Sequence, residues 1–387
     1  LYQHVIEESE KYPLKNFIVL VPEQFTMQTQ KDLVSMHPRH GIMNIDVLSF
    51  ARLAYRVFEE TGTKQMQVLD DEGKNLILRK IAGDYENKLT VLKGNIKKLG
   101  YISEVKSVIS EFTQYDIGEE EIDEMLDHLD EDSRLYYKLK DIRLLYEGFQ
   151  DYLRERYITK EELLDVLNSQ VKESELLKNS VVVLDGFTGF TPVQNRLILE
   201  LMRCCKEVWV TVTMDERENP YAYKHPYQLF GLSKQMITTL VRMAGEDHIE
   251  VEEPVCLYGY PVKRFEKNQE LAFLERNIFR YGSGRYDKAV ENLEIHAAGN
   301  PRQEADAVAE GIRILVRKEQ YRYRDIGVIV SDMNVYGDYL EQAFENYGIP
   351  VFMDHKRSIL LNSFVEYIRS LLNMAEKNFK NLVPGIW

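Results

Sequence analysis

The chemistry-bearing segment of this chain runs from Val181 to Gln194, and it begins with four apolar residues that lead directly into Asp185. A continuous apolar run is typical of a strand buried on both faces of a parallel sheet, and it places the aspartate at the carboxyl end. In nucleotide-hydrolysing motors such an aspartate helps to hold Mg²⁺, and a glutamate that activates water follows it. Here the next residue is Gly186. The segment therefore predicts a motor-type metal-site strand without its general base.

Two roles for Asp185 remain open: a Mg²⁺ ligand, or a strand-end residue that caps the following turn. The sequence contains no Gly-x-x-x-x-Gly-Lys-Ser loop to cradle a phosphate, so we expect no catalytic use of Asp185 in this chain. Because Gly186 has no side chain to position water, we also expect no ATP hydrolysis. Gln194 is expected to be structural. We predict no metal site.

The elements that must position this segment alternate between strand and helix. Ser49 stands where it can cap the helix that follows it. The alternation is the pattern of a parallel α/β sheet. The expected strands and helices of this part are strands at 17–21, 45–50, 181–184 and 208–213, and helices at 25–36, 50–60, 192–205 and 233–244.

Between these parts, residues 70–169 carry apolar side chains at helical spacing, and we expect helices and no strand there. A second α/β unit is predicted after residue 290, with strands beginning at Leu293, Asp325 and Ile349. Its expected helices are 302–318, 336–347 and 363–375.

Composition limits the class of protein. The 387 residues exceed one ordinary hydrophobic core, and no apolar run approaches the roughly 20 residues that span a bilayer. The net charge of −14 argues against unaided coating of nucleic acid, but it leaves room for a local binding surface. Three cysteines, of which Cys204 and Cys205 are adjacent and Cys256 is distant, suggest neither a disulfide framework nor a metal site, so we expect a cytoplasmic protein. Its first residues look like the middle of a helix, and we expect that something precedes them.

Several segments together resemble superfamily 1 helicases of the UvrD and RecB type. Asp185-Gly-Phe-Thr-Gly-Phe-Thr-Pro-Val-Gln194 aligns without gaps with their metal-site motif, in which Gly186, Thr188 and Gly189 replace a glutamate, a glutamine and an aspartate. Val21-Pro-Glu-Gln-Phe25 and Val47-Leu-Ser-Phe-Ala-Arg-Leu-Ala54 resemble segments that lean on single-stranded DNA. Within this group the chain is most similar to AddB (RexB in a sister branch), the B subunit of the bacterial AddAB helicase–nuclease.

The resemblance implies a fold and a domain order. We expect a RecA-like parallel-sheet domain at 1–69 and 170–290, an inserted helical domain at 70–169, and the beginning of a second RecA-like domain at 291–387. The phosphate loop and the family's C-terminal nuclease domain are both absent from this sequence. ATP and Mg²⁺ are therefore expected only in a full-length subunit, and an iron–sulfur cluster only in that missing domain.

The same resemblance implies a set of DNA-facing residues, because hydroxyls, amides and an aromatic platform suit a single strand. Phe50 has a second interpretation as a core residue, and Ser49 as a helix cap. A separate aromatic and basic loop, Tyr221-Ala-Tyr-Lys-His-Pro-Tyr227, is a candidate strand-contacting surface, or a loop packed on the helical insert. The residues carried over from the family are Gln24, Thr26, Ser49, Phe50 and Arg52.

The implied function is the helicase-like region of a subunit that resects DNA double-strand breaks for recombinational repair. This region is expected to hold or scan single-stranded or end DNA and to dock on the motor subunit AddA as a heterodimer, with no membrane contact. Two alternatives remain: a protein–protein scaffold of the same complex, and an active helicase with its phosphate loop upstream.

Overall fold

A computed structural model describes residues 1–62, 67–96, 98–154, 157–280, 282, 284–353 and 359–376. The chain divides into two compact units, Leu1–Gly259 and Tyr260–Trp387. The first contains every predicted site residue. The second includes 377–387, the end of the expected second RecA-like domain, which lies outside the described residues.

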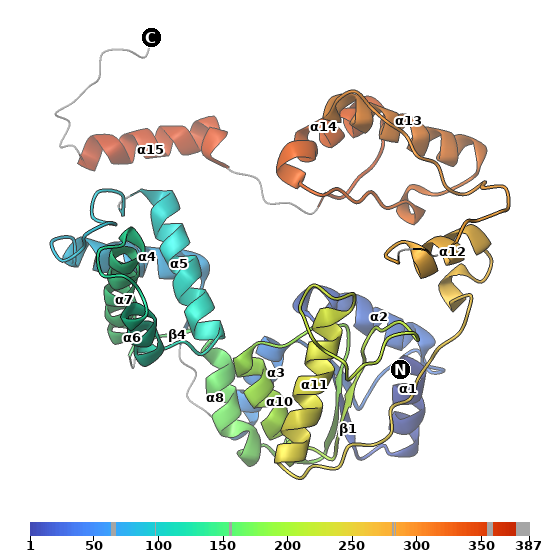
Figure 1. Ribbon diagram of the computed structural model, residues 1–387, viewed down its shortest axis with the longest axis horizontal. Helices are drawn as coiled ribbons and strands as arrows, with labels where there is room; N and C mark the ends of the chain where they lie inside the picture. The colour runs from blue at the N-terminus through green and yellow to red at the C-terminus, as the bar shows by residue number, and fades with distance from the viewer. Residues whose placement is uncertain are drawn as a thin grey trace. The chain divides into compact units, whose positions relative to one another are not determined.

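A sheet of four parallel strands forms the centre of the first unit, in the order β2-β1-β5-β6 (Figure 1). The central pair is in register from Asn16 opposite Ser180 to Leu20 opposite Leu184. The predicted parallel α/β sheet is thereby confirmed, and each strand begins and ends within a few residues of its expected position. The strands are β1 (Asn16–Leu20), β2 (Ile45–Leu48), β5 (Ser180–Leu184) and β6 (Glu207–Val210).

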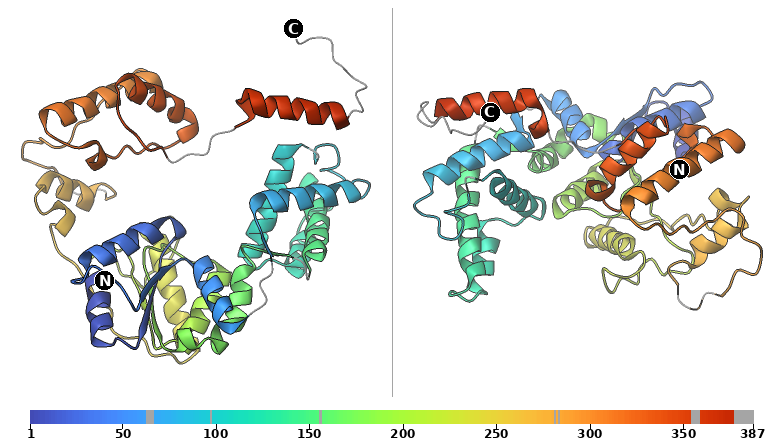
Figure 2. Two further views of the ribbon diagram at one scale, coloured as in Figure 1. Left: turned by 180° about the vertical axis from the view of Figure 1, so that it is seen from behind. Right: turned by 90° about the horizontal axis from the view of Figure 1, so that it is seen from above.

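Helices cover both faces of this sheet, which explains why its central strands are apolar at every position after the first (Figures 1 and 2). Phe17 and Val19 of β1 pack on one side with α1 and α2, whereas Ile18 and Leu20 pack on the other side with the remaining helices. The first layer is α1 (Tyr2–Lys11) and α2 (Thr26–Met36); the second is α3 (Phe50–Thr61), α8 (Leu163–Gln170), α9 (Glu175–Lys178), α10 (Pro192–Cys204) and α11 (Gly231–Glu246).

A helical body with a core of its own lies between α3 and α8 in the sequence. We predicted no strand in residues 70–169. This prediction is wrong for β4, which lies in that range and pairs in parallel with β3. Three residues are too few to show a strand period, and only the partner strand distinguishes this segment from a loop. The elements are α4 (Asp71–Asp84), α5 (Leu99–Gln114), α6 (Glu119–Asp127) and α7 (Arg134–Leu153), with β3 (Gln67–Leu69) and β4 (Tyr157–Thr159).

Buried and bridging charges join this helical body to the segment that follows it. The ammonium of Lys74, on α4, donates to both carboxylate oxygens of Glu161 at 2.9 and 2.7 Å. Burial alone raises the pKa of Glu161, but the hydrogen bond and charge of Lys74 outweigh it and hold the pKa below its ordinary value. Arg196 of α10 bridges Asp165 of α8 and Asp116, which follows α5.

The second unit has a small core between two helices, α13 (Pro301–Lys318) and α14 (Met333–Asn346). The strands predicted to begin at Leu293, Asp325 and Ile349 are wrong, since none of these segments is a strand. Ile329 and Phe352 are 98% and 90% exposed. Apolar character marks a buried strand only when a neighbouring strand pairs with it, and no described strand pairs with these segments. The unit also contains α12 (Gln269–Asn277) and α15 (Ser363–Glu376).

Short 3₁₀ helices connect several of these elements. They are η1 (Glu23–Phe25), η2 (Val171–Glu173), η3 (Lys263–Phe265), η4 (Tyr323–Asp325) and η5 (Ile359–Leu361). No helix in the described ranges is long and apolar enough to cross a membrane.

Cysteine reactivity is expected to follow burial. Burial raises the pKa of the Cys205 thiol to about 12, so almost none of it is thiolate near neutral pH, whereas Cys256 is exposed. Iodoacetamide at pH 8 should therefore alkylate Cys256 well before Cys205, as peptide mass spectrometry would measure. In denaturant the two should react alike. Equal rates in the native protein would contradict the burial of Cys205.

Candidate nucleic-acid interface

The predicted site residues gather at one edge of the four-stranded sheet. Because all four strands are parallel, the segments that follow β1, β2, β5 and β6 leave from the same carboxyl edge. Open parallel sheets bind their ligands at this edge. The segments are 21–25, 49–52, 185–191 and 211–230.

Asp185, directly after β5, is held by hydroxyl groups from two other elements. The Tyr2 hydroxyl donates to Oδ2 at 2.8 Å, and the Thr211 hydroxyl donates to Oδ1 at 2.5 Å. Its backbone N–H donates to the carbonyl of Leu20 at 2.9 Å. Both carboxylate oxygens therefore have protein partners, and the side chain ties α1 and the end of β6 to the centre of the sheet.

The surroundings of the Tyr2 hydroxyl favour its protonated form. Burial, followed by the hydrogen bond and charge of Asp185, raises the pKa of Tyr2 to about 12, although the Thr29 hydroxyl at 3.2 Å opposes this. A protonated phenol is a hydrogen-bond donor at every physiological pH. The Tyr2 hydroxyl can therefore donate to Asp185 throughout the physiological pH range.

Gly186 adopts a backbone conformation that a side chain rarely tolerates, with φ at +77°. Space is not the limit, because an added Cβ would meet only Pro22 Cδ, at an ordinary 3.7 Å. A glutamate in this place would be strained unless the loop changed its path. The loop geometry thus agrees with the loss of the general base.

Gln194 acts within the N-terminal cap of α10. Its side-chain carbonyl accepts from the backbone N–H of Thr191 at 2.9 Å, while the Thr191 hydroxyl accepts from the N–H of Gln194 at 3.3 Å. Pro192 occupies the first turn between them. This reciprocal arrangement is a capping box, and it agrees with the structural role expected for Gln194.

The residues predicted to face DNA divide into two groups. Gln24 and Arg52 are exposed at the edge, on η1 and in the first turn of α3. Thr26 is 4% exposed and donates to the carbonyl of Glu23, and Ser49 caps α3 by accepting from the N–H of Arg52 at 3.4 Å. Phe50 is 7% exposed in the core.

Aromatic rings gather behind this edge. Phe187 and Phe190 are half-buried, with ring centroids 5.1 Å apart, and Phe50 lies 5.5 and 6.3 Å from them. Phe25 in the neighbouring loop is 49% exposed. The edge therefore offers apolar ring surface beside an exposed amide and an exposed guanidinium. These are groups that suit the bases and phosphates of a single strand.

Reasoning from the sequence missed two functional partners, Tyr2 and Thr211. Thr211 follows β6 directly, so its place at the carboxyl edge was a usable signal. Tyr2 carried no such signal, because it lies 183 positions from Asp185 and on a helix.

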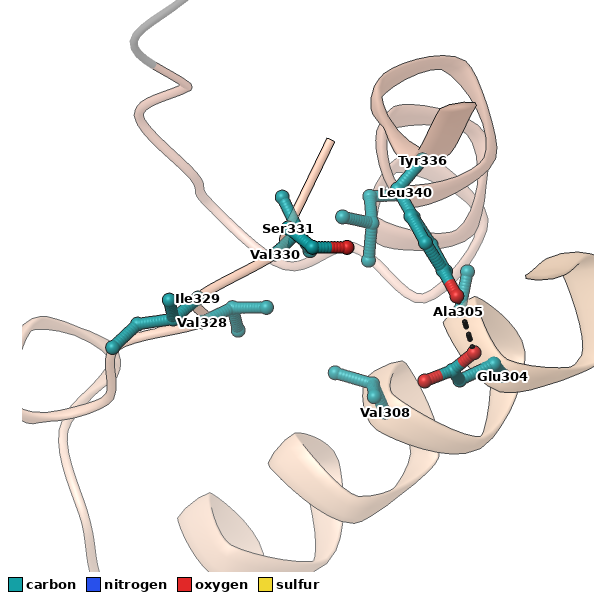
Figure 3. A pocket seen from close by; sticks show the side chains of 9 residues that line it. All are labelled: Glu304, Ala305, Val308, Val328, Ile329, Val330, Ser331, Tyr336 and Leu340. Carbon is teal, nitrogen blue, oxygen red and sulfur yellow. Dashed lines mark hydrogen bonds between the residues drawn. The ribbon is translucent and has the colours of Figure 1, made fainter. Parts of the chain in front are cut away.

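No metal cluster marks this edge among the described residues. No group of three or more His, Cys, Asp or Glu residues there is arranged to hold a metal ion. A pocket of about 230 Å³ lies in the second unit, between α13, α14 and residues 328–331 (Figure 3). Its polar contact joins the hydroxyl of Tyr336 to Glu304 at 2.8 Å. It includes no predicted site residue.

The fold and the edge define the class: an α/β protein with a doubly covered parallel sheet whose candidate binding groups lie at the carboxyl ends of its strands. The chain belongs to the family described as "ADDB, N-terminal", which matches residues 1–275. The resemblance to AddB is thereby confirmed.

Several similar proteins carry the name of the B subunit of an ATP-dependent helicase/deoxyribonuclease. The chain is 44% identical over 98% of its length to this B subunit from Lachnoclostridium phytofermentans. It is 34% identical over 97% to the protein of the same name from Caldanaerobacter subterraneus subsp. tengcongensis, and 34% over 94% to the one from Clostridium kluyveri. The chain spans about a third of the length of these relatives.

Proposed function

We propose that this chain is the helicase-like, DNA-holding part of a B subunit that resects DNA double-strand breaks for recombinational repair. Its RecA-like sheet and helical insert guide or scan a separated single strand, while the motor subunit AddA supplies translocation as the other half of a heterodimer. Resection takes place in the cytoplasm and involves no membrane. The names of the relatives and the membership of the family support this proposal.

One observation supports the non-motor part of the proposal most strongly. Both oxygens of Asp185 accept hydrogen bonds, from Tyr2 and Thr211, so the carboxylate already serves to join α1 and the end of β6 to the centre of the sheet. The following Gly186 neither offers a base nor has a conformation that suits one. ATP and Mg²⁺ are then expected only in a full-length subunit, and the iron–sulfur cluster in its C-terminal nuclease domain.

On the DNA side we assign direct contacts to Gln24 and Arg52, because their side chains are exposed. Thr26 and Ser49 shape the backbone beneath them. Phe50 supports the ring cluster whose outer members reach the surface. The combination of polar groups with ring surface suits the backbone and the unpaired bases of a strand.

A second candidate function is a scaffold that contacts the other subunit without holding DNA. The exposed apolar side chains Ile329 and Phe352 of the second unit are accessible to such a contact. Single-stranded DNA binding separates the two functions. Fluorescence anisotropy with a labelled oligonucleotide, repeated over a range of salt concentrations, should give an affinity that falls as salt rises. If the affinity for single-stranded DNA is too weak to measure even at low salt, the result favours the scaffold function.

We expect the chain to hydrolyse no ATP, with or without single-stranded DNA, because Asp185 is engaged and no general base follows it. Gly186→Glu is not expected to create activity, since the added carboxylate would start from a strained backbone. A coupled phosphate-release assay measures this. DNA-stimulated turnover that disappears in Asp185→Asn would contradict the proposal and favour an active helicase.

A further inference from the structure

Two aromatic rings stack on the surface of the loop that follows β6. The rings of His225 and Tyr227 have centroids 4.9 Å apart and planes only 6° from parallel. Tyr227 is nevertheless 81% exposed, so the stack covers little of its surface. The loop leaves from the carboxyl edge of the sheet, where its first residue, Thr211, also binds Asp185. The stack thus belongs to the same edge as the candidate interface.

Hydrogen bonds hold the backbone that carries these rings. The side-chain carbonyl of Gln228 accepts from the N–H groups of Lys224 and His225 at 2.9 and 3.1 Å. The backbone carbonyl of Gln228 then accepts from the N–H of Gly231, at the start of α11, at 2.7 Å. An exposed aromatic held in this way loses little freedom when a ligand stacks on it.

The loop also lies directly on α11. A Cβ added to Gly231 would stand 2.7 Å from the carbonyl oxygen of Pro226, closer than real contacts allow, so glycine permits this approach. Nearby, the buried ammonium of Lys234 on α11 pairs with Glu218 of the loop. The loop is therefore anchored on α11 at two places, at Glu218 before the rings and at Pro226 between them.

Lys224 is an exposed cation near the two rings. Asp215 pairs with Arg217, and Glu218 pairs with Lys234, so these two loop carboxylates are neutralised by partners. Lys224 is exposed one residue before His225. A flat π-face beside a cation is the combination that binds an unpaired base together with its phosphate.

We propose that the exposed face of Tyr227, supported by His225, is a stacking platform for an unpaired base of single-stranded nucleic acid, with Lys224 close to the adjoining phosphate. This inference rests on the proposed function, and it extends the path of the strand from the 185–191 loop across the end of β6. It adds a contact that is separate from Gln24, Arg52 and the phenylalanine cluster.

Tyr227→Ala is expected to weaken single-stranded DNA binding by about 5- to 150-fold, the range that loss of one base–aromatic stack produces. Tyr227→Phe keeps the ring and should bind as the parent does. Tyr221→Ala is the matched control, because Tyr221 is exposed in the same loop but lies outside the stack. Each variant should keep the parent's thermal unfolding curve, since the altered side chains are exposed.

Oligonucleotides with 2-aminopurine at successive positions identify the stacked base by its quenched fluorescence. We expect quenching at one position to disappear in Tyr227→Ala and to persist in Tyr227→Phe and Tyr221→Ala. Unchanged affinity and quenching in Tyr227→Ala would overturn the platform while leaving the proposed function intact. If the parent chain binds no single-stranded DNA, the proposed function and the platform both fail.

Discussion

Phe50→Ala is expected to lower the free energy of unfolding by about 3–5 kcal/mol, the cost of truncating a buried aromatic side chain. The ring is 7% exposed, belongs to the core on the α3 side of the sheet, and lies against Phe187 and Phe190. Truncation would leave a cavity directly beneath the candidate interface. Chemical denaturation of the parent and the variant measures the difference, and a change below about 1 kcal/mol would argue against a core position.

Leucine in the same place separates packing from contact with DNA. Phe50→Leu keeps an apolar side chain in the core and should retain most of the stability, but it has no flat ring to stack on a base. Because so little of the Phe50 ring reaches the surface, we expect the affinity of Phe50→Leu for single-stranded DNA to stay close to the parent value. A stable Phe50→Leu protein with a large loss of affinity would instead assign the ring a direct contact.

Arg52→Ala is expected to weaken single-stranded DNA binding by about 10- to 150-fold, since one hydrogen bond to a charged group contributes about 1.5–3 kcal/mol. The side chain is exposed in the first turn of α3, at the carboxyl edge of the sheet. Loss of one phosphate contact should also reduce the salt slope of log K by about 0.7. Anisotropy titrations at several salt concentrations measure both quantities.

Arg56 supplies the matched control for this arginine. It is exposed on the same helix, four positions later and so one turn farther from the edge. Arg56→Ala removes the same charge and should change the affinity far less. An equal loss in both variants would mean that binding depends on the general charge of α3 and not on a contact at the edge.

Local patterns were sufficient where a residue's role depends on its neighbours in sequence. The apolar runs of β1 and β5 indicated strands covered on both faces, and alternate residues do pack on opposite layers. Ser49 caps α3 as its position suggested, because an N-cap needs only the next three residues. Gln194 belongs to the same group, since its partner Thr191 lies within one turn.

Patterns were misleading where a strand depends on a partner. The apolar segments beginning at Asp325 and Ile349 have the composition of buried strands, but no described strand pairs with them. Conversely, β4 is a strand only because β3 lies beside it. Strand pairing is a long-range property, so short segments cannot report it from their own composition.

The sequence by itself determined the family, the parallel sheet and the loss of the general base at Gly186, since each depends on residue types in a fixed order. Tertiary structure alone decided what Asp185 does. Its two carboxylate oxygens accept from Tyr2, 183 positions away, and from Thr211 at the end of the neighbouring strand. Folding brings these two hydroxyls to one carboxylate, and a local sequence pattern cannot predict hydrogen bonds between residues so far apart in the chain.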